Sequence, residues 1–468
     1  MVTMDIRRII ILGVIVLLAS VGGTALLLRP EVVSTSPQAA PGGLPNTSTI
    51  EIIFSRRMQP ESVIERLTIS PAIEVKSVWE DQTLRLIPME AWPSGAEVTV
   101  TLESGAQSRI GLPAAAGVSW SFRISPVSLA YLWPAGGSSQ LYLLDPQSGE
   151  TIQLTNGSPV LSFVFSPNGR SVYFFAENNQ GGSDLFSLPR FDLETEPARM
   201  LTCQRARCDN LAIAPQGTAL AYTRNDNQVW LVNLETGTQP IQISPEGESA
   251  YQPAWSSTGN LSYYNATQMV YTVVDPTGKI ISTWPNQSGE HAAWAPGGTA
   301  FIAPDAFLQE TNILRGPSGE AENEEVDESE LEPVRVLNSQ LMVYQLGRDQ
   351  TTALTEDQLA EDFWPTFSPD GSVLAFTRRY LDEQRWTPGR QIWLMSLTSG
   401  TSPEQIKPLT GAEDYLYTSL KWHPDGKQLA AMRFNVTLLT DPPEIWLISL
   451  DGKAIRLVIG GYQPAWIP

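Results

Sequence analysis

Cysteine and histidine are scarce in this sequence of 468 residues. It contains two of each: Cys203, Cys208, His291 and His423. Both histidines fall within or beside repeated turns, so a nucleophilic triad or a two-histidine metal site would need partners that the chain does not offer. The G-x-S-x-G elbow, the H-E-x-x-H motif and the Walker loop are also missing. We therefore expect no enzymatic activity, no metal and no cofactor.

The two cysteines lie close together. In an exported, oxidising location we expect a disulfide between Cys203 and Cys208, which would hold Arg205 and Arg207 out on the loop it closes. A metal site is the alternative, but it would need further ligands.

Basic residues are few relative to acidic ones. The chain has 30 Lys and Arg against 50 Asp and Glu, a formal net charge of -20. This balance argues against nucleic acid or an anionic lipid surface as the main partner. Its simplest consequence is solubility.

One long uncharged run is present near the start. Residues 9–28 contain 20 residues without a charge, enough for a helix that spans a bilayer. Arg7 and Arg8 precede the run, so residues 1–8 are expected in the cytoplasm and the rest on the extracytoplasmic side. A cleaved signal peptide is the alternative, but the apolar stretch continues through Leu28 and leaves a poor cleavage site. Residues 29–45 are rich in Pro, Ser, Gly and Ala and predict a linker.

Residues 46–125 show the alternating pattern of half-buried strands and predict a β-sandwich of six or seven strands. Four stretches carry a resemblance to bacterial Ig-like domains of the SbsA type: 54–63, 69–71, 93–96 and 120–122. The resemblance implies a spacer or a surface module.

Residues 126–468 repeat two signatures. The first is a tight turn of the type Phe367-Ser368-Pro369-Asp370-Gly371, in which proline presets φ and glycine supplies a positive φ. It occurs six times, at 165–170, 213–218, 255–260, 294–299, 367–372 and 422–427. The second is an apolar strand centred on an aromatic residue, which occurs seven times: Tyr142, Phe186, Trp230, Tyr271, Tyr344, Trp393 and Trp446.

The mismatch between six turns and seven aromatic strands predicts how the repeats close. The first unit lacks an innermost strand, and Pro464, Ala465 and Trp466 would supply it. We therefore predict an all-β fold with a seven-bladed β-propeller closed by the last strand, with six blades as the alternative. The repeats resemble those of TolB-like, WD-like propellers, although that family has six blades.

Two insertions interrupt the repeats between a second and a third strand. Residues 316–333 lie between a second strand expected at 299–302 and a third expected at 340–346. They carry eight acidic residues and no basic one, which predicts a disordered, solvated loop. Residues 378–390 carry Arg and aromatic residues, the usual anchors of protein interfaces. We expect both insertions and the cysteine loop to lie on the same face of the propeller. The candidate binding residues come from the cysteine loop and from 378–390: Arg205, Arg207, Arg378, Arg379, Tyr380, Arg385 and Trp386. Alternatively, these arginines neutralise the acidic loop.

These observations favour a membrane-anchored extracytoplasmic binding or scaffold protein of a bacterium, single-pass in the cell membrane. Its propeller would hold a protein, a peptide or a cell-envelope glycan. Paired carboxylates leave no signature in a single sequence, so a glycan lyase or hydrolase with an acidic pair in the central channel stays open. A purely structural surface protein is the third possibility.

The membrane anchor can be tested directly. If residues 9–28 act as an uncleaved signal anchor, the protein recovered from membranes retains them, because their apolar side chains keep the segment in the bilayer. N-terminal mass mapping of the membrane fraction measures this. A mature protein that begins after Ala25 would contradict the anchor and favour a signal peptide.

Overall fold

The computed structural model describes residues 29–39, 43–46, 48–192, 194–237, 239–311, 334–382, 384–397 and 406–467. These residues form two domains, which divide between Val127 and Ser128. The predicted anchor (9–28) and the acidic segment (316–333) lie outside the described residues. Across the described ranges, no helix combines the length and the hydropathy needed to span a membrane.

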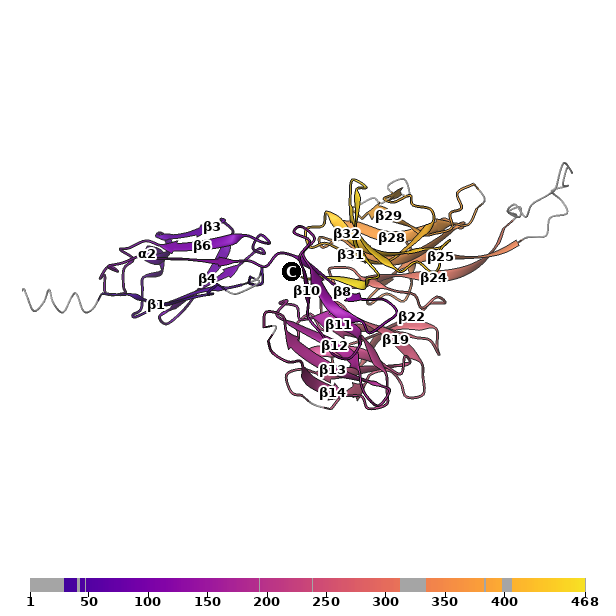
Figure 1. Ribbon diagram of the computed structural model, residues 1–468, viewed down its shortest axis with the longest axis horizontal. Helices are drawn as coiled ribbons and strands as arrows, with labels where there is room; N and C mark the ends of the chain where they lie inside the picture. Colours follow the sequence, from indigo (N-terminus) through magenta and orange to yellow (C-terminus); the bar gives the residue numbers. More distant parts are fainter. Residues whose placement is uncertain are drawn as a thin grey trace, which may run out of the picture. The chain divides into compact units, whose positions relative to one another are not determined.

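The N-terminal domain is the predicted β-sandwich (Figure 1). One sheet has the order β1 (Val32–Ser36), β2 (Ile50–Phe54), β5 (Thr83–Pro88), β4 (Val75–Glu80). The other has the order β3 (Leu67–Ser70), β6 (Glu97–Leu102), β7 (Val118–Arg123), and a short helix, α2 (Pro60–Ile64), precedes β3. Their inward-facing apolar side chains form one core, in which the buried Trp92 donates a hydrogen bond to the Ser48 carbonyl at 2.8 Å.

The expectation that residues 29–45 form only a linker is wrong for Val32–Ser36. This segment is strand β1, which pairs antiparallel with β2 (Thr35 with Ile52, Ser36 with Glu51). The pairing uses backbone N–H and C=O groups, which every residue has. The side chains of this edge strand, two valines followed by Ser, Thr and Ser, show no apolar alternation to detect.

The C-terminal domain consists of successive four-stranded antiparallel units, which we number from one in chain order. Unit one is β35 (Tyr462–Ile467), β8 (Ser128–Trp133), β9 (Gln140–Leu144), β10 (Thr151–Gln153). Unit two is β11 (Val160–Phe165), β12 (Ser171–Glu177), β13 (Ser183–Pro189), β14 (Ala198–Thr202); unit three is β15 (Cys208–Ile213), β16 (Ala219–Arg224), β17 (Gln228–Asn233), β18 (Ile241–Gln242). Unit four is β19 (Ala250–Trp255), β20 (Leu261–Asn265), β21 (Val270–Val274), β22 (Ile280–Pro285).

Units five and six share a sheet. Unit five is β23 (Ala293–Trp294), β24 (Ala300–Thr311), β25 (Val334–Gln345), β26 (Thr352–Ala353); unit six is β27 (Ala360–Phe367), β28 (Val373–Tyr380), β29 (Gln391–Ser396), β30 (Ile406–Pro408). A parallel pairing of Ser339 with Glu361 joins the two units. Unit seven is β31 (Tyr415–Trp422), β32 (Gln428–Asn435), β33 (Glu444–Ser449), β34 (Ala454–Ile459).

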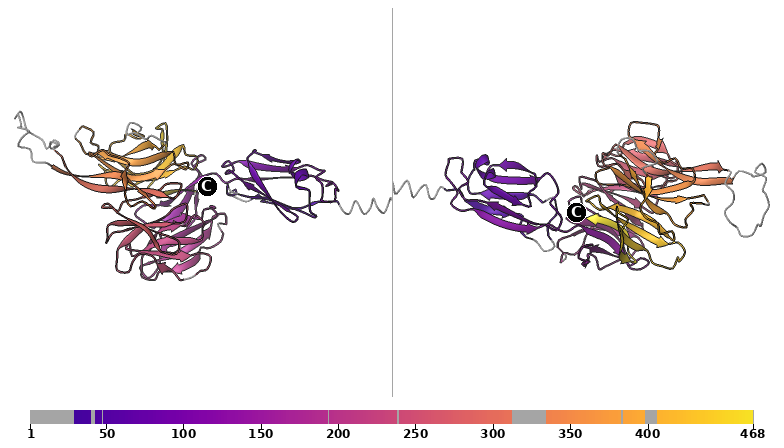
Figure 2. Two further views of the ribbon diagram at one scale, coloured as in Figure 1. Left: turned by 180° about the vertical axis from the view of Figure 1, so that it is seen from behind. Right: turned by 90° about the horizontal axis from the view of Figure 1, so that it is seen from above.

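The hairpin of β24 and β25 is longer than the sequence pattern predicted. The second strand was expected at residues 299–302 and the third at 340–346, but the pairing runs from Ala300 with Gln345 to Thr311 with Val334. Figure 2 shows this hairpin extending beyond the other strands of its domain.

The six predicted turns are present between the first and second strands of units two to seven. In each, the glycine N–H donates to the carbonyl three residues earlier and φ of the glycine is positive: Gly169, Gly217, Gly259, Gly298, Gly371 and Gly426. In unit six, Asp370 accepts hydrogen bonds from the Ser368 and Ser372 hydroxyls at 2.6 and 2.8 Å. These bonds, together with one from the Ser372 N–H, lower the pKa of Asp370 to about 2. The turn aspartate therefore stabilises the hairpin.

The innermost strands share a one-residue bulge. In unit six, Phe363 pairs with Thr377 and Thr366 with Ala375, so three steps on β27 match two on β28. Trp364 takes the extra place with φ of 52°. Residues with positive φ hold the same place in four other units: Asn210, Gln252, Ser419 and Gln463.

Tryptophans near the ends of four innermost strands tie neighbouring units together. Each indole N–H donates to a backbone carbonyl in the innermost strand of the preceding unit: Trp255 to Ala212, Trp294 to Ala254, Trp422 to Thr366 and Trp466 to Lys421, at 3.0–3.3 Å. The last bond runs from unit one back to unit seven.

Unit one is composite, with its innermost strand from the end of the chain. Strand β35 pairs antiparallel with β8 (Ala465 with Ala130, Trp466 with Leu129), as the sequence predicted for residues 464–466. Ile467 is fully buried in a cluster that joins units one and two. A second cluster, with Leu129, Tyr131 and Ile445, joins unit one to unit seven.

Replacing Ile467 tests the importance of the composite unit. Ile467→Ala should lower the free energy of unfolding of the C-terminal domain by about 2–5 kcal/mol, because it opens a cavity in a fully buried cluster. Ile455→Ala is the matched control, because Ile455 on β34 is 62% exposed. It should change the free energy of unfolding by less than about 0.5 kcal/mol. Urea unfolding followed by tryptophan fluorescence measures both. Equal effects would contradict a structural role for β35.

Candidate functional site

The loops between second and third strands and the connections between units meet on one face of the C-terminal domain, which we call the loop face. In unit two, the Asn178 side chain donates to the Gln204 carbonyl on the connection to unit three at 2.7 Å. In unit six, the Gly389 N–H donates to the Glu413 carbonyl on the connection to unit seven at 2.9 Å. The cysteine loop and the 381–390 loop therefore lie on this face, as predicted.

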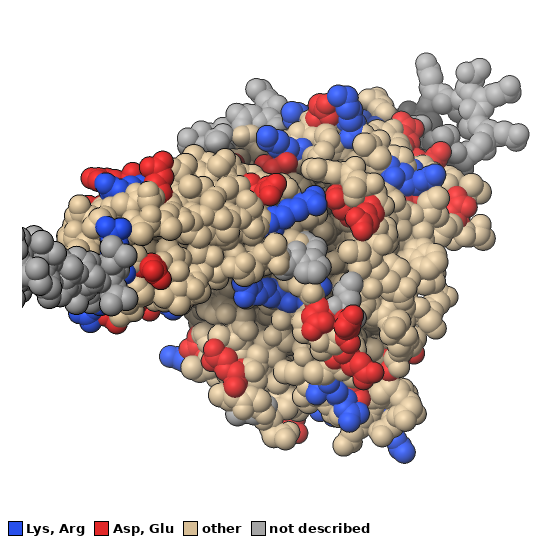
Figure 3. All heavy atoms as spheres, turned by 60° about the vertical axis from the view of Figure 1, so that its left-hand side comes forward, with Lys and Arg blue, Asp and Glu red and all other residues tan. Residues whose placement is uncertain are grey.

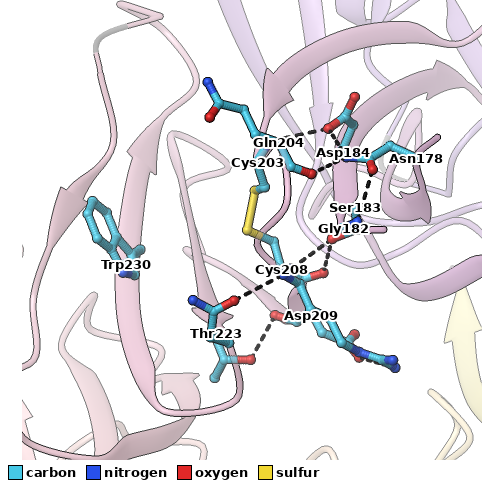
Figure 4. The surroundings of a disulfide bond; sticks show 12 residues. Asn178, Gly182, Ser183, Asp184, Cys203, Gln204, Cys208, Asp209, Thr223 and Trp230 are labelled. Carbon is cyan, nitrogen blue, oxygen red and sulfur yellow. Dashed lines mark hydrogen bonds and ion pairs between the residues drawn. A yellow bond between two sulfur atoms is a disulfide. The ribbon is translucent and has the colours of Figure 1, made fainter. Parts of the chain in front are cut away.

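The predicted disulfide between Cys203 and Cys208 is present, and both cysteines are buried (Figure 4). The Ser183 hydroxyl donates to the Cys208 carbonyl and accepts from the Cys208 N–H, both at 2.7 Å. Gly182 lies so close beneath this loop that a Cβ would stand 2.3 Å from the Gln204 carbonyl oxygen. The loop is therefore anchored to unit two, and Arg205 and Arg207 on it are exposed, as expected.

Arg378 was predicted to be an exposed binding residue, and this is wrong. It lies in strand β28, is 5% exposed, and donates two hydrogen bonds to Asp362 on β27, at 2.7 and 2.8 Å. Asp362 is 1% exposed. Burial raises the pKa of Asp362, and the hydrogen bonds from Arg378 oppose that rise. The two residues form a buried ion pair within unit six.

Arg379 also has a local partner. It donates to Glu361 on β27 at 2.6 Å, and Arg390 donates to the same carboxylate oxygen at 2.9 Å. The carboxylates that Arg378 and Arg379 face are therefore in unit six itself, whereas the alternative that they neutralise residues 316–333 concerns a segment outside the described residues.

Tyr380, Arg385 and Trp386 lie at the surface of unit six. The Arg385 guanidinium stacks 3.9 Å from the centre of the Tyr380 ring and forms ion pairs with Asp382 at 2.7 Å and Asp357 at 3.1 Å. Trp386 is 55% exposed and its backbone bridges to Tyr380. These three residues retain the exposed aromatic and basic character that was predicted for a binding surface.

A pocket of about 360 Å³ lies beside Tyr380, between unit six and the connection that enters it from unit five. Its polar and aromatic lining consists of Thr355, Glu356, Asp357, Arg378, Tyr380 and Trp393. The Tyr380 and Trp393 rings meet edge to face with their centres 5.7 Å apart. Glu356, Asp357 and Trp393 were not predicted as site residues, because Trp393 belongs to the repeated aromatic strands and the connection carries no motif.

A second charged group lies near the inner ends of units five and six. Burial raises the pKa of Glu290, while Arg390 opposes the rise. Arg390 lies 4.3 Å from the centre of the Phe363 ring, and its buried Nε has no hydrogen-bond partner among the described residues. Arg390 interacts with the charges of both Glu290 and Glu361, so these two carboxyl groups are candidates for the acid pair that an enzymatic propeller would need.

His291 and Trp364 lie close together at the innermost strands of the same two units: His291 just precedes β23, and Trp364 is in β27. Their rings stack with centres 4.9 Å apart. Burial, with a contribution from the charge of Lys421 in unit seven, lowers the pKa of His291 to about 3. His291 is therefore neutral at physiological pH.

The predicted residues do not form one site. Arg205 and Arg207 lie on the connection between units two and three, whereas Tyr380, Arg385 and Trp386 lie on unit six. On the face drawn in Figure 3, acidic and basic side chains are interspersed and form no continuous basic surface.

Comparison with known proteins identifies the N-terminal domain. Residues 28–124 match the family of bacterial Ig-like domains, which confirms the resemblance and extends it over strand β1. None of the curated proteins compared with the chain matches it.

Solved structures similar to the chain include two TolB proteins and an archaeal propeller. TolB from Acinetobacter baumannii is 12% identical over 86% of this chain and 83% of its own, with a TM-score of 0.42. The putative TolB from Agrobacterium tumefaciens is 14% identical over 72% and 91%, with a TM-score of 0.37. The β-propeller domain of the Trilobed protease from Pyrococcus furiosus is 10% identical over 78% and 95%, with a TM-score of 0.45. Likenesses at these TM-scores say nothing about what the chain binds.

The buried ion pair of Arg378 and Asp362 should contribute to the stability of the C-terminal domain. Arg378→Met should lower the free energy of unfolding of the C-terminal domain by about 3–5 kcal/mol, because it leaves the Asp362 carboxylate buried without a cation. Adding Asp362→Leu should restore most of the loss. Arg379→Met is the control and should cost less than about 1 kcal/mol, since Arg390 still pairs with Glu361. Urea denaturation measures all three. An Arg378 variant as stable as the control would contradict the assigned role.

Proposed function

We propose that this protein is a membrane-anchored, extracytoplasmic binding protein of a bacterium. Its C-terminal domain would be a closed seven-bladed β-propeller that holds a protein ligand on the loop face of unit six. The Ig-like domain would act as a spacer between this propeller and the anchor. The observation that carries the proposal is the surface of unit six, where the exposed Trp386 lies beside Tyr380 and its pocket.

The seven-bladed ring is supported by the packing between units. Hydrophobic clusters join each unit to the next, from one and two through to six and seven. A further cluster joins unit seven to unit one. A cyclic series of this kind is what a closed ring requires, and a propeller leaves only short, protected strand edges.

Export is supported by two observations. The uncharged run of residues 9–28 follows two arginines, the arrangement of a signal anchor. The disulfide between Cys203 and Cys208 suits an oxidising compartment, since cytosolic proteins rarely keep such bonds.

A binding role for unit six is supported by the side chains that it exposes. Tryptophan, tyrosine and arginine contribute most of the binding energy in many protein interfaces, because they offer large contact areas with a polar group at the end. The Asp382 and Asp357 carboxylates hold the Arg385 side chain in place, so less conformational entropy is lost when a partner covers it.

Catalysis is the second candidate function, and the raised pKa of Glu290 favours it. Arg390 interacts with both Glu290 and Glu361, and a glycan-cleaving enzyme uses two carboxyl groups, one of which has a raised pKa. However, one oxygen of Glu361 already accepts hydrogen bonds from both Arg379 and Arg390. A carboxylate held in this way is a weak base and a weak nucleophile, so we favour binding.

Site-specific photo-cross-linking tests the loop face. The full chain with benzoylphenylalanine in place of Trp386 should give a discrete adduct with an envelope protein in intact cells. The same residue in place of Lys427, which is exposed on a first-to-second strand turn on the opposite face, should give none. Mass spectrometry identifies the adducts. No adduct at position 386, or equal adducts at both positions, would contradict the proposal.

A further inference from the structure

The pocket beside Tyr380 has a chemistry that selects its ligand. The volume, about 360 Å³, is near the lower end of the range for small-molecule sites. It therefore suits one long side chain better than a sugar chain. Which side chain fits depends on the hydrogen-bonding groups that the lining leaves free.

Two of the pocket's donors are already engaged. The Arg378 guanidinium is held by Asp362 through two hydrogen bonds. The Thr355 hydroxyl accepts from the Leu341 N–H at 2.9 Å, and its hydrogen bond with Asp362 lowers the pKa of that carboxyl. Asp362 neutralises the charge of Arg378, although it engages only two of the five N–H groups of that guanidinium, so an anionic ligand gains little attraction there.

The acceptors, by contrast, are available. Among the described residues, the exposed Glu356 makes no hydrogen bond or ion pair. Asp357 accepts from the Leu359 N–H at 2.9 Å and from Arg385 at 3.1 Å, which leaves lone pairs on both oxygens. A ligand rich in N–H donors would satisfy both carboxylates.

The charged side chains around the pocket also favour a cationic ligand. The pocket and its immediate partners contain the carboxylates of Glu356, Asp357, Asp362 and Asp382 against the two guanidinium groups of Arg378 and Arg385. The acidic side chains are therefore in excess, although both arginines lie against the aromatic walls. A positive charge placed between Glu356 and Asp357 is attracted, and an anion is repelled.

The aromatic walls complete the site. Tyr380 and Trp393 stand edge to face and already contact the guanidinium groups of Arg378 and Arg385, so they would pack against the aliphatic part of the ligand's side chain. We propose that this pocket binds a basic side chain, lysine or arginine, of the protein ligand held on the loop face. The inference rests on the proposed binding function and adds the class of side chain that is recognised.

Short peptides test the inference on the full chain in detergent. The probe is acetyl-Gly-Arg-Gly-amide, and its matched control replaces arginine with citrulline, which has nearly the same shape without the charge. Saturation-transfer NMR, which detects weak binding, measures the affinity. We expect the arginine peptide to bind at least tenfold more tightly than the citrulline peptide, and less tightly as salt is raised.

Variants locate the binding within the pocket. Glu356→Gln should lower the affinity for the arginine peptide at least fivefold, because it removes the unpaired carboxylate. Glu356→Asp should retain most of that affinity. Glu413→Gln makes the same charge change on another exposed loop-face glutamate outside the pocket and should have no effect. Equal binding of the two peptides, no detectable binding, or equal effects at positions 356 and 413 would overturn the inference.

The cross-linking experiment separates this inference from the function on which it rests. If the adduct at position 386 forms but the arginine and citrulline peptides bind equally, the loop face binds a partner and the pocket does not recognise a basic side chain. If neither is seen, the binding function itself is wrong.

Discussion

The one-residue bulge in the innermost strands sets which side chains meet across each first hairpin. Without the extra residue at Trp364, the pairing that starts from Phe367 and Leu374 would set Asp362 opposite Arg379. With it, Asp362 faces Arg378 and Glu361 faces Arg379. The bidentate buried pair follows from that single shift. Arg378 lines the pocket, so the charge balance of the pocket depends on a feature of the innermost strand.

Repetition made the fold predictable from the sequence, because each turn and each aromatic strand recurs. Six copies of the turn and seven aromatic strands predicted the units and the pairing of residues 464–466 with the first unit. The strand β1 and the long β24–β25 hairpin were missed. Both are held by backbone pairing between strands with mixed side chains, which leaves no apolar alternation to read.

The candidate site was predictable only in part. Local composition identified Tyr380, Arg385 and Trp386, which lie at the surface of unit six as expected. The role of Arg378 could not be predicted, because a bulge changes the register by one residue and the sequence carries no mark of it. Glu356 and Asp357 belong to a connection between units, and only the fold brings them to the aromatic residues.

The composite first unit has a consequence for the order of events during synthesis. Strand β8 begins at Ser128, but its partner β35 begins at Tyr462, so more than 300 residues separate two paired strands. The N-terminal sandwich can fold as soon as it leaves the ribosome. The first unit has to wait with an unpaired strand edge until residues 462–467 are made. A nonsense mutation that removes only β35 would leave β8 permanently exposed, and such an edge recruits other chains.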